Sequence, residues 1–156
     1  MKVGGLTSKG NKTFVENSGF YDHVTTYDDI AKMDGSVKTA IIDMAGNGDI
    51  TGALYEVFGE NIVYNCMVGK SHWQGAPPAK PAKGAPPSMF FAPDRAKQRF
   101  ADWGPEGFAS NLAARWLPFC EGAKDWLDLY HGQGLESFLP VYKDFLNGSA
   151  NPARGY

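Results

Sequence analysis

The segment TAIIDMAGNGDITGALYEVFGENIVYNCMV, residues Thr39–Val68, decides the expected fold class of this chain. It opens with Thr39–Ala45, a nearly continuous apolar run that is typical of a parallel strand covered on both faces. Asn61–Val68 is a second run with strand character. Between them, apolar residues recur at the spacing of one helix face, and Gly59 is expected to end that helix. These residues are Ile50, Ala53, Leu54, Val57 and Phe58. Strand, helix and strand within about 30 residues predict a βαβ unit with parallel strands.

The amino-terminal flank predicts two further strands and two short helices. Residues 2–7 are expected to form a short buried strand, which the polar run after it ends. Residues 23–27 are rich in β-branched and aromatic side chains and are expected to form a second strand. Residues 11–18 can form a helix between them. A helix of one or two turns, capped by Asp28 or Asp29, is expected to follow the second strand.

The carboxyl-terminal flank changes character at residues 74–88. This segment holds five of the ten prolines, two lysines and no acid, so it is expected to be an extended, mobile loop, with a partner-binding proline segment as the alternative. The chain beyond it is expected to be largely helical. The expected features are a helix that begins at Pro93, an interruption at Gly104-Pro105, a kink or break at Pro118, a strand within residues 126–130, and a last helix over Leu135–Leu146 that Asn147-Gly148 ends.

Composition sets limits on function. The 156 residues are 43% hydrophobic and 21% charged, with a net charge of -2, which is ordinary for a globular domain and gives no field that attracts nucleic acid or anionic membranes. The sequence has no long apolar run behind its first residues, so neither a secretory signal nor a membrane span is expected. Cys66 and Cys120 are far apart and the three histidines are dispersed, which predicts free thiols, a cytoplasmic location and no metal site.

The first candidate binding loop is Thr7-Ser8-Lys9-Gly10-Asn11. In a dinucleotide-binding fold, an acid at the end of the second strand binds the ribose hydroxyls of NAD, whereas a cation with hydroxyls or amides accepts the 2′-phosphate of NADP. No acid occurs here before Glu16. The loop therefore indicates NADP(H) if this is that strand. A helix N-cap with an incidental lysine is the alternative.

The second candidate loop is Gly46-Asn47-Gly48, with Gly52 four residues further on. It lies between a strand and a helix, as a phosphate-binding glycine loop does, but GxGxxG spacing would place the third glycine at Thr51. A tight turn that approaches a ribose or nicotinamide is the favoured interpretation.

The third candidate loop is Val68–Trp73. Gly69 at the end of a central strand would let a flat ring approach the backbone. Hydride transfer to a carbonyl or alkene also needs a proton donor, for which His72, Lys70 and Tyr27 are candidates. A surface or packing role is the alternative for His72. The tripeptide Gly69-Lys70-Ser71 does not form a P-loop, because the glycine required five residues earlier is a tyrosine here.

Several of these segments, taken in order, resemble an uncharacterised bacterial family of medium-chain dehydrogenase/reductase-like proteins, akin to quinone oxidoreductases. The resemblance rests on Gly5-Leu6-Thr7-Ser8, Tyr21-Asp22-His23-Val24, Ile42-Asp43-Met44-Ala45-Gly46, Val68-Gly69 with His72-Trp73, Phe90-Phe91-Ala92-Pro93-Asp94 and Trp103-Gly104-Pro105-Glu106-Gly107-Phe108. It implies a partial Rossmann-like parallel sheet of three to four strands with a helical C-terminal part. The catalytic barrel, the first Rossmann strand and the glycine-rich loop of such proteins are not expected within this sequence.

The resemblance also implies positions for a cofactor. Ser8, Lys9 and Asn11 are expected to face the 2′-phosphate of NADP(H), and Thr7 is a further expected cofactor-binding residue. Ala45 and Gly46 are expected to lie along the nicotinamide ribose, and Gly69 and Phe91 near the carboxamide. In the strand order 3-2-1-4-5-6, loss of strand 1 exposes the edges of strands 2 and 4, so the chain is expected to pair these edges, to form a homodimer across them, or to aggregate.

Three hypotheses for function follow. The chain is the C-terminal, nucleotide-binding portion of an NADP(H)-dependent, zinc-independent oxidoreductase of unknown small-molecule substrate, or a non-catalytic NADP(H) sensor or interaction module, or a truncated reading frame without activity of its own. The expected organisation is a partial Rossmann unit over residues 1–73, the loop 74–88, and a helical part over residues 89–156.

Overall fold

The structure is a computed structural model that describes residues 1–70, 81 and 83–156. The chain divides into two compact units. One unit comprises Met1–Val24 and Pro105–Tyr156, and we call it the terminal unit. The other comprises Thr25–Gly104, and we call it the central unit. Each is described by itself below.

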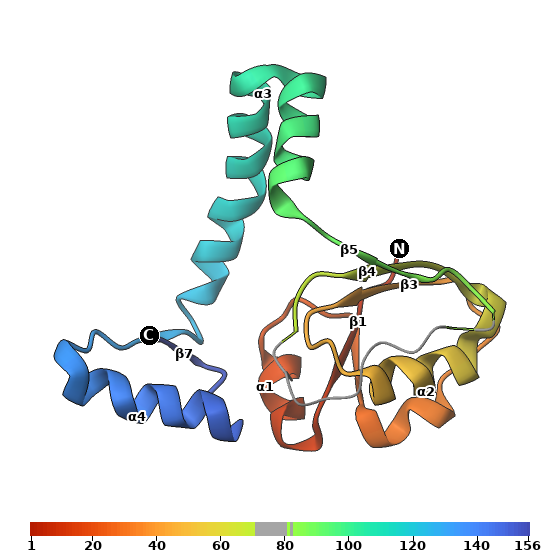
Figure 1. The fold of residues 1–156 in the computed structure, drawn as a ribbon, viewed down its shortest axis with the longest axis horizontal. Coiled ribbons are helices and arrows are strands. Elements are labelled where there is room, and N and C mark those ends of the chain that lie inside the picture. The colour runs from red at the N-terminus through yellow and green to blue at the C-terminus, as the bar shows by residue number, and fades with distance from the viewer. Residues whose placement is uncertain (71–80, 82) are drawn as a thin grey trace. The chain divides into compact units, whose positions relative to one another are not determined.

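The central unit is built on a small parallel sheet (Figure 1). Strand β3 (Thr39–Asp43) pairs with β4 (Ile62–Met67), and β4 pairs with β5 (Pro87–Met89), both in parallel. Helix α2 (Gly48–Phe58) connects β3 to β4. The predicted βαβ unit is therefore confirmed. Because all three strands run the same way, their carboxyl ends lie at one edge of the sheet, which we call the carboxyl edge.

Local sequence explains where α2 begins and ends. The Asn47 side chain accepts a hydrogen bond from the backbone N–H of Asp49 at 3.0 Å, which caps the first turn. Gly59 follows the last helical residue with φ +49°, a conformation that glycine adopts at little cost. Leu54 and Phe58 are buried on the helix face that was expected to be apolar, and they form the core of this unit with Ile41 and Ile62.

A buried polar link supplements this core. Asn65 in β4 is 1% exposed, and its Nδ2 donates to the hydroxyl of Tyr55 in α2 at 2.9 Å. The Tyr55 hydroxyl donates to the backbone oxygen of Ala85, just before β5. Helix α2 is thus hydrogen-bonded to two neighbouring parts of the sheet as well as packed against it.

Two expectations for this unit were wrong. Strand β3 is not covered on both faces, since Ile42 remains 56% exposed and Met44, just beyond the strand, 62%. Side chains alternate between the faces of a strand, so the buried Ile41 and the exposed Ile42 lie on opposite faces of β3. Helix α2 lies along one face of the sheet (Figure 1). The segment 74–88 is also not loop to its end, because β5 begins at Pro87; residues 74–80 and 82 lie outside the described part of the chain. A proline cannot donate a backbone hydrogen bond to a neighbouring strand, but it is tolerated at the first residue of a strand, as here.

Two helical elements of the central unit also differ from expectation. A 3-10 helix, η2 (Tyr27–Lys32), follows β2 (His23–Thr26), and its N-cap is Thr26 rather than Asp28 or Asp29. The Thr26 hydroxyl donates to the Asp29 carboxylate at 2.8 Å. Asp29 is therefore a hydrogen-bond partner of the N-cap residue and not the N-cap itself. A second 3-10 helix, η3 (Gly59–Asn61), leads into β4.

The amino-terminal part of the terminal unit has the predicted strand and helix. Strand β1 (Gly4–Thr7) is followed by the 3-10 helix η1 (Lys9–Asn11) and by α1 (Lys12–Asn17). Strand β1 pairs with β2, which runs across the boundary between the units. Among the described residues, β1 and β2 form a sheet of their own that is not joined to β3.

The long helix α3 (Ala92–Ala123) also crosses that boundary. It is interrupted at Gly104, whose φ of 69° and ψ of 170° are not helical, so the expected interruption before Pro105 is confirmed. A break at Pro118 was not confirmed, because the helix continues through this residue to Ala123. In the terminal unit, the ring of Trp126 packs edge-on against Phe14, Phe20 and Phe119. The aromatic side chains of α3 are not a buried core, since Trp103, Trp116 and Phe119 remain 40–57% exposed.

The carboxyl-terminal elements follow the sequence closely. Strand β6 (Asp128–Leu129) pairs in parallel with β7 (Arg154–Gly155). Between them lies α4 (Gly134–Asn147), which ends at Gly148 in the left-handed conformation, as predicted. The chain is therefore a mixed α/β protein with small parallel sheets.

Candidate functional site

The carboxyl edge of the central unit is organised by Asp43, the last residue of β3. Its Oδ1 accepts hydrogen bonds from the backbone N–H groups of Ala45 at 2.9 Å and Gly46 at 2.8 Å. Its Oδ2 lies 3.4 Å from the donating hydroxyl of Thr51 in α2. Aspartate commonly closes turns by accepting from amides two and three residues ahead. Asp43 therefore fixes the tight turn that leads from β3 to α2.

Gly46 brings this turn against the end of β4. Its φ is +66°, and a Cβ atom added to it would lie 2.9 Å from the carbonyl oxygen of Gly69 and 2.9 Å from the Cα of Lys70. The backbone N–H groups of Val68 and Gly69 donate to the carbonyl oxygen of Asp43, at 2.8 and 3.4 Å. Only glycine fits position 46, because both the backbone conformation and the space exclude a side chain.

Four of the predicted site residues are thus brought together. Ala45 and Gly46 follow β3, Gly69 and Lys70 follow β4, and the two turns are in contact. Phe91 follows β5 at the same edge, where its ring is 57% exposed. The backbone N–H of Phe90 donates to the carbonyl oxygen of Met67 at 2.8 Å, which ties this third turn to the end of β4.

Tyr27, the first residue of η2, is electrostatically coupled to this edge. Partial burial raises the pKa of its hydroxyl, and the negative charge of Asp43 raises it further. The hydroxyl is therefore protonated at neutral pH and can donate a hydrogen bond, but its raised pKa makes it a weak acid. His72, the third candidate proton donor, lies outside the described residues.

The residues expected to face a 2′-phosphate lie in the terminal unit. Thr7 ends β1 and is buried, whereas Lys9 is exposed in η1. Ser8 and Asn11 occupy the N-cap positions of η1 and α1, but neither side chain makes a capping hydrogen bond. The simple helix-cap interpretation of this loop therefore does not account for the two polar side chains.

The turn before α2 lacks the features of a phosphate-binding loop. The first turn of α2 is capped by the Asn47 side chain and carries the carboxylate of Asp49, which would repel a phosphate. Gly52 has no atom within 4 Å of the place where a Cβ would lie, so no close contact requires glycine there. The geometry favours the interpretation of Gly46-Asn47-Gly48 as a tight turn.

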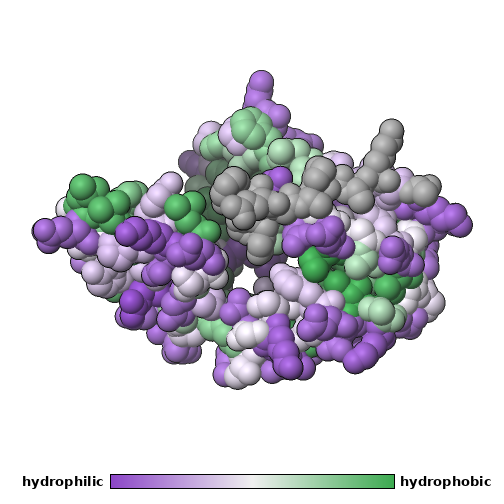
Figure 2. Space-filling model, turned by 60° about the horizontal axis from the view of Figure 1, so that its bottom comes forward, coloured by the Kyte–Doolittle hydropathy of each residue, from purple (hydrophilic) through white to green (hydrophobic). Residues whose placement is uncertain are grey.

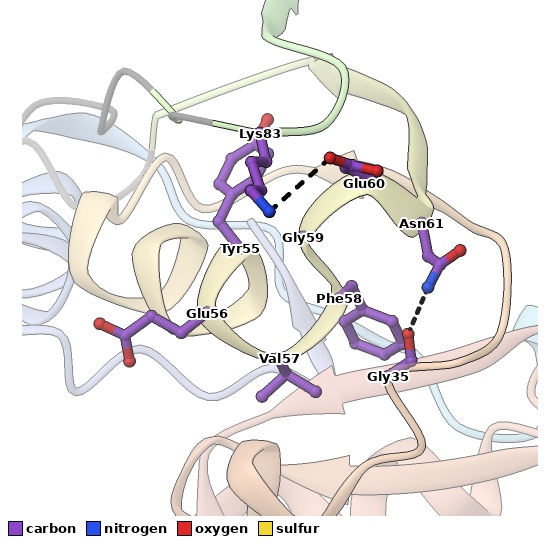
Figure 3. A pocket seen from close by; sticks show the side chains of 9 residues that line it. All are labelled: Gly35, Tyr55, Glu56, Val57, Phe58, Gly59, Glu60, Asn61 and Lys83. Carbon is purple, nitrogen blue, oxygen red and sulfur yellow. Dashed lines mark hydrogen bonds and ion pairs between the residues drawn. The ribbon is translucent and has the colours of Figure 1, made fainter.

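A pocket of about 560 Å³ lies at the opposite end of the central sheet (Figure 3). It is lined by the end of α2, by η3 and by Lys83, whose Nζ is 3.7 Å from Glu60. The Asn61 side chain donates to the carbonyl oxygen of Gly35 at 2.8 Å and holds one wall. Because this pocket adjoins the amino end of β4, it is separate from the carboxyl edge where ligands of parallel α/β sheets bind.

The family model described as "Protein of unknown function (DUF2855)" matches residues 1–151. The chain belongs to the DUF2855 family. No curated protein and no solved structure matches this DUF2855 chain. Within the described residues of the DUF2855 chain, no helix is long and apolar enough to cross a membrane, and no three His, Cys, Asp or Glu side chains are grouped to hold a metal ion. Its cysteines, Cys66 and Cys120, are both free.

Sequence reasoning missed the role of Asp43. The residue was read only as part of an apolar run and of a family-like segment. Its position immediately before Met44-Ala45-Gly46 was the available signal, because an aspartate two or three residues before a glycine at a strand end is typical of a side-chain-closed turn.

Proposed function

We propose that this chain is the C-terminal, nucleotide-binding portion of an NADP(H)-dependent, zinc-independent oxidoreductase with a partial Rossmann-like sheet. The observation that carries the proposal is the contact between the Gly46 turn and the Gly69 turn at the carboxyl edge. Ligands of open parallel α/β sheets bind outside the carboxyl ends of the strands. The strand neighbours β1–β2 and β3–β4–β5 support this, because they match strands 2–3 and 4–5–6 of the expected order.

The nicotinamide half of the cofactor would lie at the carboxyl edge. Two glycine-containing turns present backbone there without side chains, which allows a flat ring and its ribose to approach closely. The exposed ring of Phe91 supplies an apolar surface at the same edge. Ala45 and Gly46 would then line the ribose, and Gly69 and Phe91 the carboxamide.

The adenosine 2′-phosphate would be bound by the loop Thr7–Asn11. Lys9 is exposed, and the polar groups of Ser8 and Asn11 are not used as helix caps. A lysine side chain, together with neighbouring hydroxyl and amide groups, is suited to bind a phosphate monoester. Since the loop has no acid, it offers nothing that would favour the ribose hydroxyls of NAD.

For proton donation we place Lys70 before Tyr27. The reason is its position, since Lys70 lies against the Gly46 turn at the carboxyl edge. The substrate would be a small molecule with a carbonyl or an activated alkene, and the location would be cytoplasmic.

Ligands that represent one half of NADP(H) can test cofactor binding by each unit separately. Calorimetric titration with 2′-phospho-AMP and AMP probes the Thr7–Asn11 loop, and titration with reduced nicotinamide mononucleotide probes the carboxyl edge. We expect 2′-phospho-AMP to bind more tightly than AMP, and Lys9→Ala to remove most of that preference, at least about tenfold, because a charged hydrogen bond to phosphate contributes about 1.5–3 kcal/mol.

The matched control is Lys12→Ala. Lys12 lies three residues after Lys9 in the sequence, and its Nζ is 3.8 Å from Oε1 of Glu16. This variant is expected to keep the preference for the 2′-phosphate. Equal binding of AMP and 2′-phospho-AMP by the unmodified chain would refute the cofactor assignment.

A non-catalytic interaction module is the second candidate function. The observation that favours it is the number of large apolar side chains left exposed, among them Met44, Trp116 and Phe145 at 57–62%. Binding of NADPH without turnover of any carbonyl or enone substrate would support this candidate.

A further inference from the structure

We draw no further inference here: the strongest candidate, the patch of exposed apolar side chains on α4 at the left of Figure 2, carries none, because nothing in the described part of the chain shows what covers it.

Discussion

Replacement of Gly46 by alanine should destabilise the central unit strongly, because two penalties coincide at this residue. A left-handed backbone costs a residue with a Cβ about 1–2 kcal/mol, and the φ of Gly46 is +66°. The new Cβ would also lie 2.9 Å from the Gly69 carbonyl oxygen and 2.8 Å from Cγ of Lys70. Forcing an extra methyl group into such a contact costs about 1–3 kcal/mol.

The reduced entropy of the unfolded chain offsets about 0.4–1 kcal/mol of this loss. The net expectation for Gly46→Ala is a decrease of about 1–4.5 kcal/mol in the free energy of unfolding. Gly52→Ala is the matched control, since it also adds one methyl group near the start of α2 but meets no atom within 4 Å. It should stabilise the helix by about 0.5–1 kcal/mol, because alanine is the better helix former.

Both variants can be measured by urea unfolding followed by far-UV circular dichroism, with hydrogen exchange of the peptide that spans residues 39–69 as a local probe. Gly46→Ala should unfold at a lower urea concentration and lose protection of the Val68 and Gly69 amides. If the two alanine variants were equally stable, the contact between the turns after β3 and β4 would not be as close as described, and the carboxyl edge would lose its basis.

Three further predictions concern residues of the same edge. Asp43→Ala should lower the free energy of unfolding by about 1–3 kcal/mol, because it leaves the Ala45 and Gly46 amides without their acceptor. Asp43→Asn keeps an acceptor oxygen at this position and should lose less stability. The urea midpoints of the two variants would distinguish them. Asn47→Ala should cost about 1 kcal/mol through loss of the α2 cap and Asn47→Ser little, which thermal unfolding can check; equal losses would contradict the cap. Because the pKa of Tyr27 is raised, the folded chain holds this proton more tightly than the unfolded chain, so its stabilisation is complete below pH 10 and is lost as the pH rises through the raised pKa. Tyr27→Phe should therefore lose less stability than the unmodified chain as the pH rises above 10, and parallel losses would rule out the coupling.

Helix α2 and the strands β3 and β4 could be predicted from the sequence, because local patterns define them. The apolar helix face from Ile50 to Phe58, the cap at Asn47 and the stop at Gly59 lie within a dozen residues, and such short-range patterns define α2 and the two strands beside it. The interruption at Gly104 and the helix end at Gly148 are equally local, because each depends on one glycine with positive φ.

Burial and pairing were less predictable, because they depend on distant parts of the chain. An apolar run such as Thr39–Ala45 predicts a strand, but whether both faces are covered depends on which elements pack there, and Ile42 remained exposed. Strand β5 is three residues long and includes a proline, so its pairing with β4 left almost no local signal.

For the candidate site, sequence position was informative where parallel strands end. Gly46 and Gly69 were predicted from two separate loops, and the parallel pairing of β3 with β4 brings them into contact. The coupling between Asp43 and Tyr27 could not be predicted, because it depends on how η2 packs near the end of β3 and not on any motif.

The most direct test of the account is a titration of the ¹⁵N-labelled chain with NADPH and with NADH, followed by amide chemical shifts. The account predicts that NADPH shifts the amides of Gly46, Gly69 and Phe91 together with those of Ser8 and Lys9, and that NADH leaves Ser8 and Lys9 almost unaffected. Shifts confined to the pocket at Gly59 and Asn61, or no shifts at millimolar NADPH, would contradict it.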